Sequence, residues 1–94
     1  MGDLNNALES LHRAVELAPD NPEFLFNLGV TLQTIGVQNM SNKYLDSAIQ
    51  TFKKMAEQMP DNADAWNHIG ICYKVMGQIE DSKFYFDRQA HSKF

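Results

Sequence analysis

The sequence predicts an all-α protein built from about five antiparallel helices that repeat along the chain. Apolar residues recur at spacings of three and four through most of the 94 residues, which is the period of an amphipathic helix. No segment shows the strict apolar–polar alternation of a half-buried strand. Short motifs also recur at a fixed distance, since Leu28-Gly29 returns as Ile69-Gly70 and Pro19-Asp20-Asn21 returns as Pro60-Asp61-Asn62.

Two repeat distances occur, and together they locate an insertion. Ala48 and Phe52 recur as Ser82 and Phe86 after about 34 residues, a period within the usual range of repeat proteins. The motifs above recur at a longer distance, and one period explains both distances if seven residues are inserted once, within residues 37–43. We therefore interpret the chain as one domain. It contains the second half of a first repeat (1–21), a second repeat with the insertion (22–62) and a third repeat (63–94).

The first helix is expected over Asp3–Ala18, because Leu4, Leu8 and Leu11 share one helical face. Pro19 ends this helix, since a proline disfavours helical backbone at the residue before it. The helix that would normally precede it in a repeat is missing from the sequence, so we expect the three leucines to be uncovered. Phe84, Tyr85 and Phe94 are expected to be uncovered at the other end. Uncovered terminal helices predict self-association into a homo-oligomer.

The second helix is expected to begin at Pro22, a residue suited to the first helical position, after a cap at Asp20 or Asn21. It is expected to end at Gly36, acting as a left-handed C-terminal cap. Residues 37–40 then form the loop that leads to the third helix.

The third helix is expected to begin near Ser41, about one turn early, because seven residues are close to two helical turns. Met40 and Leu45 would continue its apolar stripe, and Pro60 ends it. A fourth helix is marked by Trp66, Ile69, Cys72, Tyr73 and Met76 and closes at Gly77. Apolar residues from Ile79 to Ala90 mark a fifth helix.

The stretch WNHIGICYKVMG, followed by FYF, resembles a tetratricopeptide repeat, whose landmarks are Trp, Leu-Gly, Tyr, Ala, Phe, Ala and Pro over about 34 residues. In this sequence the landmarks fall on Trp66, Ile69, Gly70, Tyr73, Gly77, Ser82, Phe86 and Gln89. The resemblance covers essentially the whole chain and implies a right-handed α-α superhelix, a solenoid of stacked helix pairs. Ser82 and Gln89 depart from the small-residue pattern, which implies looser packing of the last helix.

The resemblance implies a function in binding. In such repeats the first helix of each pair lines a concave groove that receives an extended or helical peptide, so a non-catalytic protein–protein interaction scaffold is implied. Carried over position by position, the implied peptide-binding residues are Glu23, Phe26, Asn27, Val30, Gln33, Thr34, Asp64, Asn67, His68, Ile71, Lys74 and Val75. Phe26, Val30 and Ile71 are expected to form an apolar patch that favours a partner.

One subclass of the family is not expected. Members that hold the acidic C-terminus of a chaperone use Lys and Asn at matching groove positions. Here those positions hold Phe26, Val30, Asn67 and Ile71, and Lys74 is the only base. The sequence therefore predicts no strong carboxylate-clamp activity.

No catalytic, cofactor or metal site is predicted. His68 and Cys72 are four residues apart and could both face a metal, but Cys72 belongs to an apolar stripe. We interpret Cys72 as a buried structural thiol and expect no enzyme activity. Two other hypotheses stay open: the regulatory or substrate-recruiting arm of an enzyme whose catalytic domain lies elsewhere, and a self-assembly module.

Composition narrows the partners further. The net charge of −4 argues against nucleic acid or an anionic membrane as the main partner, because both attract basic surfaces. A single cysteine excludes an intrachain disulfide, and no apolar run reaches the length that spans a bilayer. We therefore expect a protein or peptide partner and a cytoplasmic location.

Overall fold

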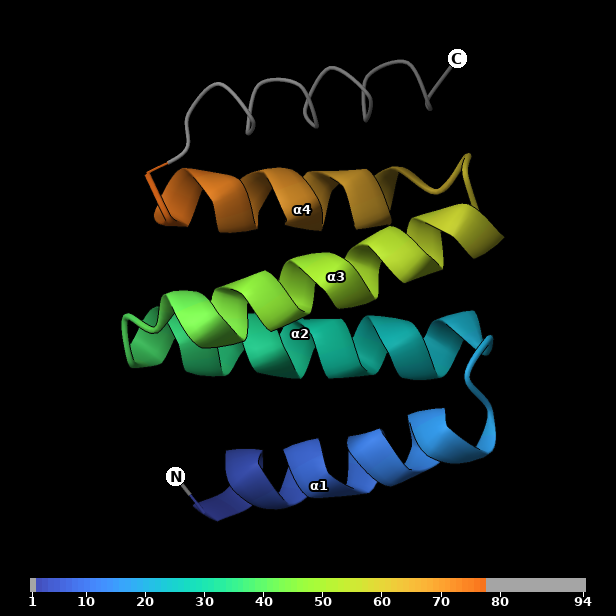
Figure 1. The fold of residues 1–94 in the computed structure, drawn as a ribbon, viewed down its shortest axis with the longest axis horizontal. Helices are drawn as coiled ribbons and strands as arrows, with labels where there is room; N and C mark the ends of the chain where they lie inside the picture. Colours follow the sequence, from blue (N-terminus) through green and yellow to red (C-terminus); the bar gives the residue numbers. More distant parts are fainter. Residues whose placement is uncertain (1, 78–94) are drawn as a thin grey trace.

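The computed structural model describes residues 2–77, which form four α-helices joined by short turns (Figure 1). The helices are α1 (Gly2–Leu17), α2 (Pro22–Gln38), α3 (Asn42–Gln58) and α4 (Ala63–Val75). Within residues 2–77 there is no strand, and the all-α prediction is confirmed. The predicted fifth helix, with Phe84 and Tyr85, lies outside the described residues.

Consecutive helices run antiparallel, and each packs against the next along the chain (Figure 1). The closest pair is α2 with α3, while α1 packs on α2 and α4 packs on α3. In addition, α2 touches α4. These are the first helices of the predicted second and third repeats, so the structure brings together the two elements on which the predicted site residues lie.

The structure confirms the predicted cap and start of α2 and the predicted helix stops at Pro19 and Pro60. The Asn21 side chain caps α2 by accepting hydrogen bonds from the backbone N–H groups of Glu23 and Phe24, and Pro22 follows it. Asn62 caps α4 by accepting from the backbone N–H of Asp64 at 2.8 Å. α1 ends before Pro19 and α3 ends before Pro60.

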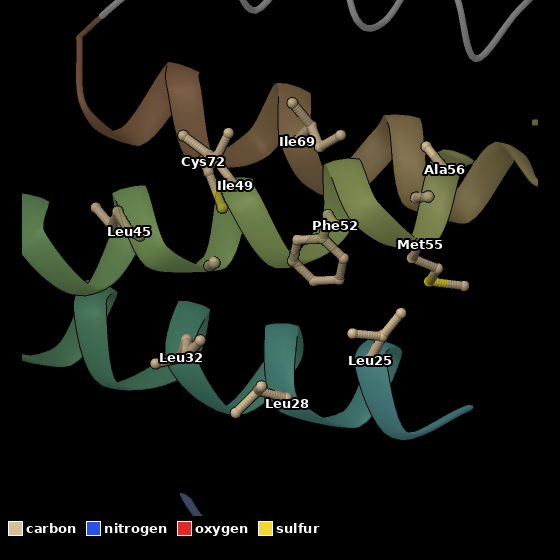
Figure 2. Close-up of a cluster of buried hydrophobic side chains, with 12 residues drawn as sticks. Leu25, Leu28, Leu32, Leu45, Ile49, Phe52, Met55, Ala56, Ile69 and Cys72 are labelled. Atoms are coloured by element: carbon tan, nitrogen blue, oxygen red, sulfur yellow. The ribbon is translucent and has the colours of Figure 1, made fainter. Parts of the chain in front are cut away.

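The hydrophobic core lies mainly between α2, α3 and α4 (Figure 2). Its fully or almost fully buried members are Leu25, Leu28, Leu32, Leu45, Ala48, Ile49, Phe52, Met55, Ala56, Ala65, Ile69 and Cys72. Phe52 has 0% of its surface exposed and faces Gly29 of α2. A Cβ atom added to Gly29 would lie 2.7 Å from the Phe52 ring. The absence of a side chain at Gly29 therefore allows α2 and α3 to pack closely.

Gly36 does not end α2, and that prediction is wrong. The helix continues to Gln38, and the left-handed backbone falls on Met40, with φ of 51°. The Ser41 N–H donates to the Gly36 carbonyl and the Met40 N–H to the Val37 carbonyl, which is the Schellman pattern of a helix end. Gly36 itself is buried, and a Cβ there would lie 2.8 Å from Leu45 Cγ. Close contact with α3 therefore explains this glycine.

The inserted corner is shorter than predicted. Only residues 39–41 connect α2 to α3, and Val37, a residue of the predicted loop, is helical. Ser41 caps α3, and Leu45 is buried as expected, but Met40 is 90% exposed and does not continue the apolar stripe. α2 has 17 residues where α4 has 13, so the longer corner is accompanied by about one extra helical turn.

The leucines of α1 are not uncovered, contrary to expectation. Leu4, Leu8 and Leu11 are half-buried, and Leu8 and Leu11 pack against the core. Leu17 is the large apolar residue of α1 that is open to solvent, with 88% of its surface exposed. The exposed apolar surface of α1 that could drive self-association is therefore smaller than the sequence suggested.

The position of the left-handed residue leads to a prediction about Met40. Met40→Gly is expected to raise the free energy of unfolding by about 0.5–1 kcal/mol. A side chain in left-handed backbone costs roughly 1–2 kcal/mol, and the added freedom of glycine in the unfolded chain offsets part of that gain. The opposite substitution at another left-handed position, Gly77→Met, should lower the stability of the protein, because Gly77 has φ of +84°. Urea unfolding of both variants measures these effects, and a loss of stability in Met40→Gly would contradict the assignment.

Candidate functional site

The residues predicted to bind a partner lie on α2 and α4 and differ in exposure. Half-buried members are Phe26, Val30, Gln33, Thr34, Asn67, His68 and Ile71. Exposed members are Glu23, Asn27, Asp64, Lys74 and Val75. The α2 residues from Glu23 to Thr34 recur at spacings of three and four, so they form one face of that helix.

Three aromatic rings join α2, α3 and α4, and we call Phe26, Phe52 and His68 the ring cluster. The His68 ring stacks on Phe52 with centroids 5.0 Å apart and planes at 12°. Phe26 makes T-shaped contacts with both other rings, with centroids 5.5 Å from His68 and 6.2 Å from Phe52. His68 Nδ1 also donates to Gln33 Oε1 at 2.8 Å. These contacts link α2 and α4, the two helices that carry the predicted site residues.

His68 is held in its neutral form by this environment. Burial lowers the pKa of His68 below its ordinary value of 6.5, and the carboxylate of Asp64 opposes that shift only in part. Because the proton on Nδ1 is used in the bond to Gln33, the neutral ring keeps Nε2 as an acceptor. His68 therefore adds a polar, uncharged edge to the surface between α2 and α4.

The ring cluster separates two hollows in the surface, and together with them it forms what we call the α2–α4 groove. The first hollow has a volume of about 320 Å³ and is lined by Pro22, Glu23, Phe26, Met55, Met59, Asn62 and Asp64. The second has a volume of about 400 Å³ and is lined by Val30, Gln33, Thr34, Val37, Gln38 and His68. Volumes of this size fall near the lower end of those of ligand pockets.

The structure brings together some predicted site residues and leaves others apart. Phe26 lines the first hollow and Val30 the second, so the expected apolar patch is spread over two separate hollows. Neither hollow is lined by Ile71, Lys74 or the pair Asn27 and Asn67.

Several lining residues were missed by reasoning from the sequence. Met55 of α3 and Met59, the residue that follows this helix, line the first hollow, whereas the residues predicted from the family resemblance came only from α2 and α4. Val37 and Gln38 line the second hollow because α2 extends past Gly36. A signal for Val37 was present, since it continues the spacing of Val30, Gln33 and Thr34 by one more turn.

Cys72 is a structural thiol. It has 0% of its surface exposed within the core, and burial raises its pKa to about 12. A thiol with that pKa is almost wholly protonated at neutral pH and is a poor nucleophile or metal ligand. Among residues 2–77, no three His, Cys, Asp or Glu side chains are placed to hold a metal ion.

The pKa of His68 predicts a pH effect on stability. The folded pKa lies below the unfolded value, so the unfolded chain binds more protons as the pH falls through 6.5. The contribution of neutral His68 is fully present above pH 6.5 and is lost as the pH falls toward the folded pKa. Because His68 is only half-buried, the slope should stay well under the one-proton limit of about 1.4 kcal/mol per pH unit.

Urea unfolding between pH 7 and pH 5 measures this effect, with His68→Gln as the test variant. The difference in stability between wild type and His68→Gln should shrink as the pH falls. His12→Gln, at an exposed position on α1, serves as the control. A constant difference across the pH range would show that protonation of His68 does not matter for folding.

None of the helices in residues 2–77 is both long and apolar enough to cross a bilayer.

Comparisons with known proteins agree with this architecture. A family model described as "TPR repeat" matches residues 1–36, and one described as "Tetratricopeptide repeat" matches residues 40–93. No curated protein sequence matches the chain.

Among solved structures, two forms of MamA AMB-1 are similar. The P212121 form has 25% identity over 98% of this chain and a TM-score of 0.86, and the C2221 form has 26% over 95% and 0.83. A further crystal structure of MamA has 21% identity over 97% of the chain and a TM-score of 0.83, which shows the fold alone. The chain spans about half the length of these structures, with coverage of 50%, 48% and 49% of their chains.

Proposed function

Because the chain belongs to the tetratricopeptide repeat family, we propose that it is a non-catalytic protein-interaction scaffold that binds a partner peptide or helix in the α2–α4 groove. The chain would act as a single domain of about two and a half repeats, as part of a longer repeat protein. Its partner would be a protein, and neither nucleic acid nor a membrane is expected because of the net charge of −4.

The observation that carries this proposal is the ring cluster with a hollow on each side. Phe26 and His68 are half-buried aromatic rings fixed by contacts within the protein, so they present apolar surface without needing to rearrange. Rigid aromatic groups at a concave surface are the usual anchors of protein interfaces. Gln33, Thr34 and Gln38 add amide and hydroxyl groups that can bond a peptide backbone.

Absence of catalysis is part of the proposal. The Cys72 thiol is buried and protonated, and the neutral His68 is already bonded to Gln33. An arm of an enzyme or a self-assembly module would use the same kind of surface, but no observation in residues 2–77 favours either over peptide binding. A cytoplasmic location remains a prediction from the composition.

The proposal can be tested with a phage-displayed library of random nonapeptides. Wild-type protein should enrich peptides that lose binding to a Phe26→Ser, Val30→Ser double variant, because both substitutions remove apolar surface from the groove. Leu17→Ser changes an exposed apolar residue of α1 that lines neither hollow, and this variant should bind the same peptides. Circular dichroism confirms that each variant keeps its helices. Peptides that bind the double variant equally well would place recognition outside the groove.

A carboxylate-rich C-terminal peptide should bind weakly. Lys74 is the only base at the matching positions, and Glu23 and Asp64 place two carboxylates at the first hollow. Repulsion between like charges opposes entry of an acidic tail. Fluorescence anisotropy with an acidic peptide that has a free C-terminus measures this. Low-micromolar affinity that is lost in Lys74→Ala would overturn the prediction.

A further inference from the structure

We propose that the first hollow receives a lysine or arginine side chain of the bound peptide. This inference rests on the proposed function, because it names the chemistry of the partner at one end of the α2–α4 groove. Three features carry it: an apolar floor, a rim whose charged groups are both carboxylates, and an uncharged second hollow at a defined distance.

The floor suits the long aliphatic part of a basic side chain. Phe26 comes from α2, whereas Met55 and Met59 come from the C-terminal end of α3 and the residue after it, and the three make an apolar surface. Figure 2 shows Met55 directed from α3 toward α2, near Leu25. Lysine and arginine bury their methylene stems on such surfaces while the charged head stays in water. The Phe26 ring can also attract a cation that lies over its face.

The rim supplies the charge that such a side chain needs. Glu23 and Asp64 are the charged residues that line the first hollow, and both are exposed to solvent. Both lie in the first turn of a helix, where backbone N–H groups would otherwise attract an anion. The Asn21 cap already bonds the N–H groups of Glu23 and Phe24, and the Asn62 cap bonds the N–H of Asp64. The hollow therefore presents negative charge and selects against an acidic peptide.

The second hollow fixes where the rest of the peptide lies. No charged residue lines it, so it suits an aliphatic or amide side chain. The α2 residues that line the two hollows are centred about ten residues apart, which is about 15 Å of helix. An extended peptide covers that distance in about four residues. The expected partner sequence thus has a basic residue and an uncharged residue about four positions apart.

The sequences of the peptides selected from the random nonapeptide library test this inference. We expect lysine or arginine to be enriched at one position, with an aliphatic or amide residue about four positions away. Replacing the basic residue of the best peptide by norleucine should weaken binding about tenfold at low salt, because it removes the charge but keeps the stem.

A matched pair of variants completes the test. Glu23→Gln with Asp64→Asn should weaken the basic peptide about tenfold and leave the norleucine peptide unchanged. Glu57→Gln with Asp61→Asn makes the same change in net charge at exposed residues that do not line the hollow, and should leave both peptides unchanged.

Outcomes separate this inference from the proposed function. Groove-dependent peptides without a basic residue, or equal effects of the two charge variants, would overturn the inference and leave the scaffold proposal standing. Failure of the wild type to enrich any peptide relative to the Phe26→Ser, Val30→Ser variant would overturn both.

Discussion

Replacing Phe52 with alanine is expected to lower the free energy of unfolding by about 3–5 kcal/mol, the cost of truncating a large buried aromatic residue. Phe52 has 0% of its surface exposed and lies among core residues of α2, α3 and α4 (Figure 2). Its ring also contacts Phe26 and His68, so the substitution leaves a cavity under the groove. Native proteins have about 5–15 kcal/mol of stability in total, so a large share of it would be lost.

Urea unfolding at 10 °C measures the effect while the variant still folds. Phe24→Ala is the matched control, because Phe24 lies on α2 but is only half-buried and outside the ring cluster. It should cost clearly less than Phe52→Ala. Equal losses at the two positions would show that Phe52 in the ring cluster contributes no more to the free energy of unfolding than a half-buried phenylalanine does.

The same residue couples stability to binding. If Phe52 supports Phe26 and His68 from below, then Phe52→Leu should weaken peptide binding even at temperatures where the protein is fully folded. Its side chain keeps the apolar character but cannot stack with His68. The effect would act through the position of the two groove rings, because Phe52 itself is buried and does not line either hollow.

The helices could be predicted from the sequence because their signals are local. Pro19 and Pro60 stop α1 and α3, and Asn21 caps α2 at its predicted start. Such signals act on backbone groups close in sequence, so one sequence is enough to read them. The prediction is stronger because the same stop-and-cap motif, Pro-Asp-Asn, stands at the end of the first repeat and of the second.

The errors arose where distant parts of the chain decide the structure. A glycine at a helix end and a glycine at a helix contact look the same in sequence, and Gly36 is the second kind because Leu45 packs against it. Met40 then adopts the left-handed backbone conformation, which is unfavourable for a residue with a side chain. No nearby sequence feature predicts this. Likewise, the reach of Met55 and Met59 into the first hollow depends on how α3 crosses α2, which the repeat pattern alone did not specify.

The contact between Gly29 and Phe52 predicts that the effect of Gly29→Ala on stability changes sign when Phe52 is replaced by leucine. In the wild type, Gly29→Ala should destabilise by about 1–3 kcal/mol, because the new Cβ would lie 2.7 Å from Cε1 and Cζ of Phe52. The ring cannot move away freely, since it is fully buried and stacked on His68. In a Phe52→Leu background those two ring atoms are gone. The same substitution should then stabilise by up to about 1 kcal/mol, the advantage of alanine over glycine inside a helix.

Urea unfolding of the wild type, the two single variants and the double variant measures the coupling free energy directly. Asn27→Ala provides the control, because Asn27 is exposed on the same helix and should change stability equally in both backgrounds. A Gly29→Ala effect of the same sign and size with Phe52 and with Leu at position 52 would mean that the ring does not limit the approach of α2 and α3. In that case the glycine at position 29 would need another explanation, and the close packing inferred for this helix pair would be wrong.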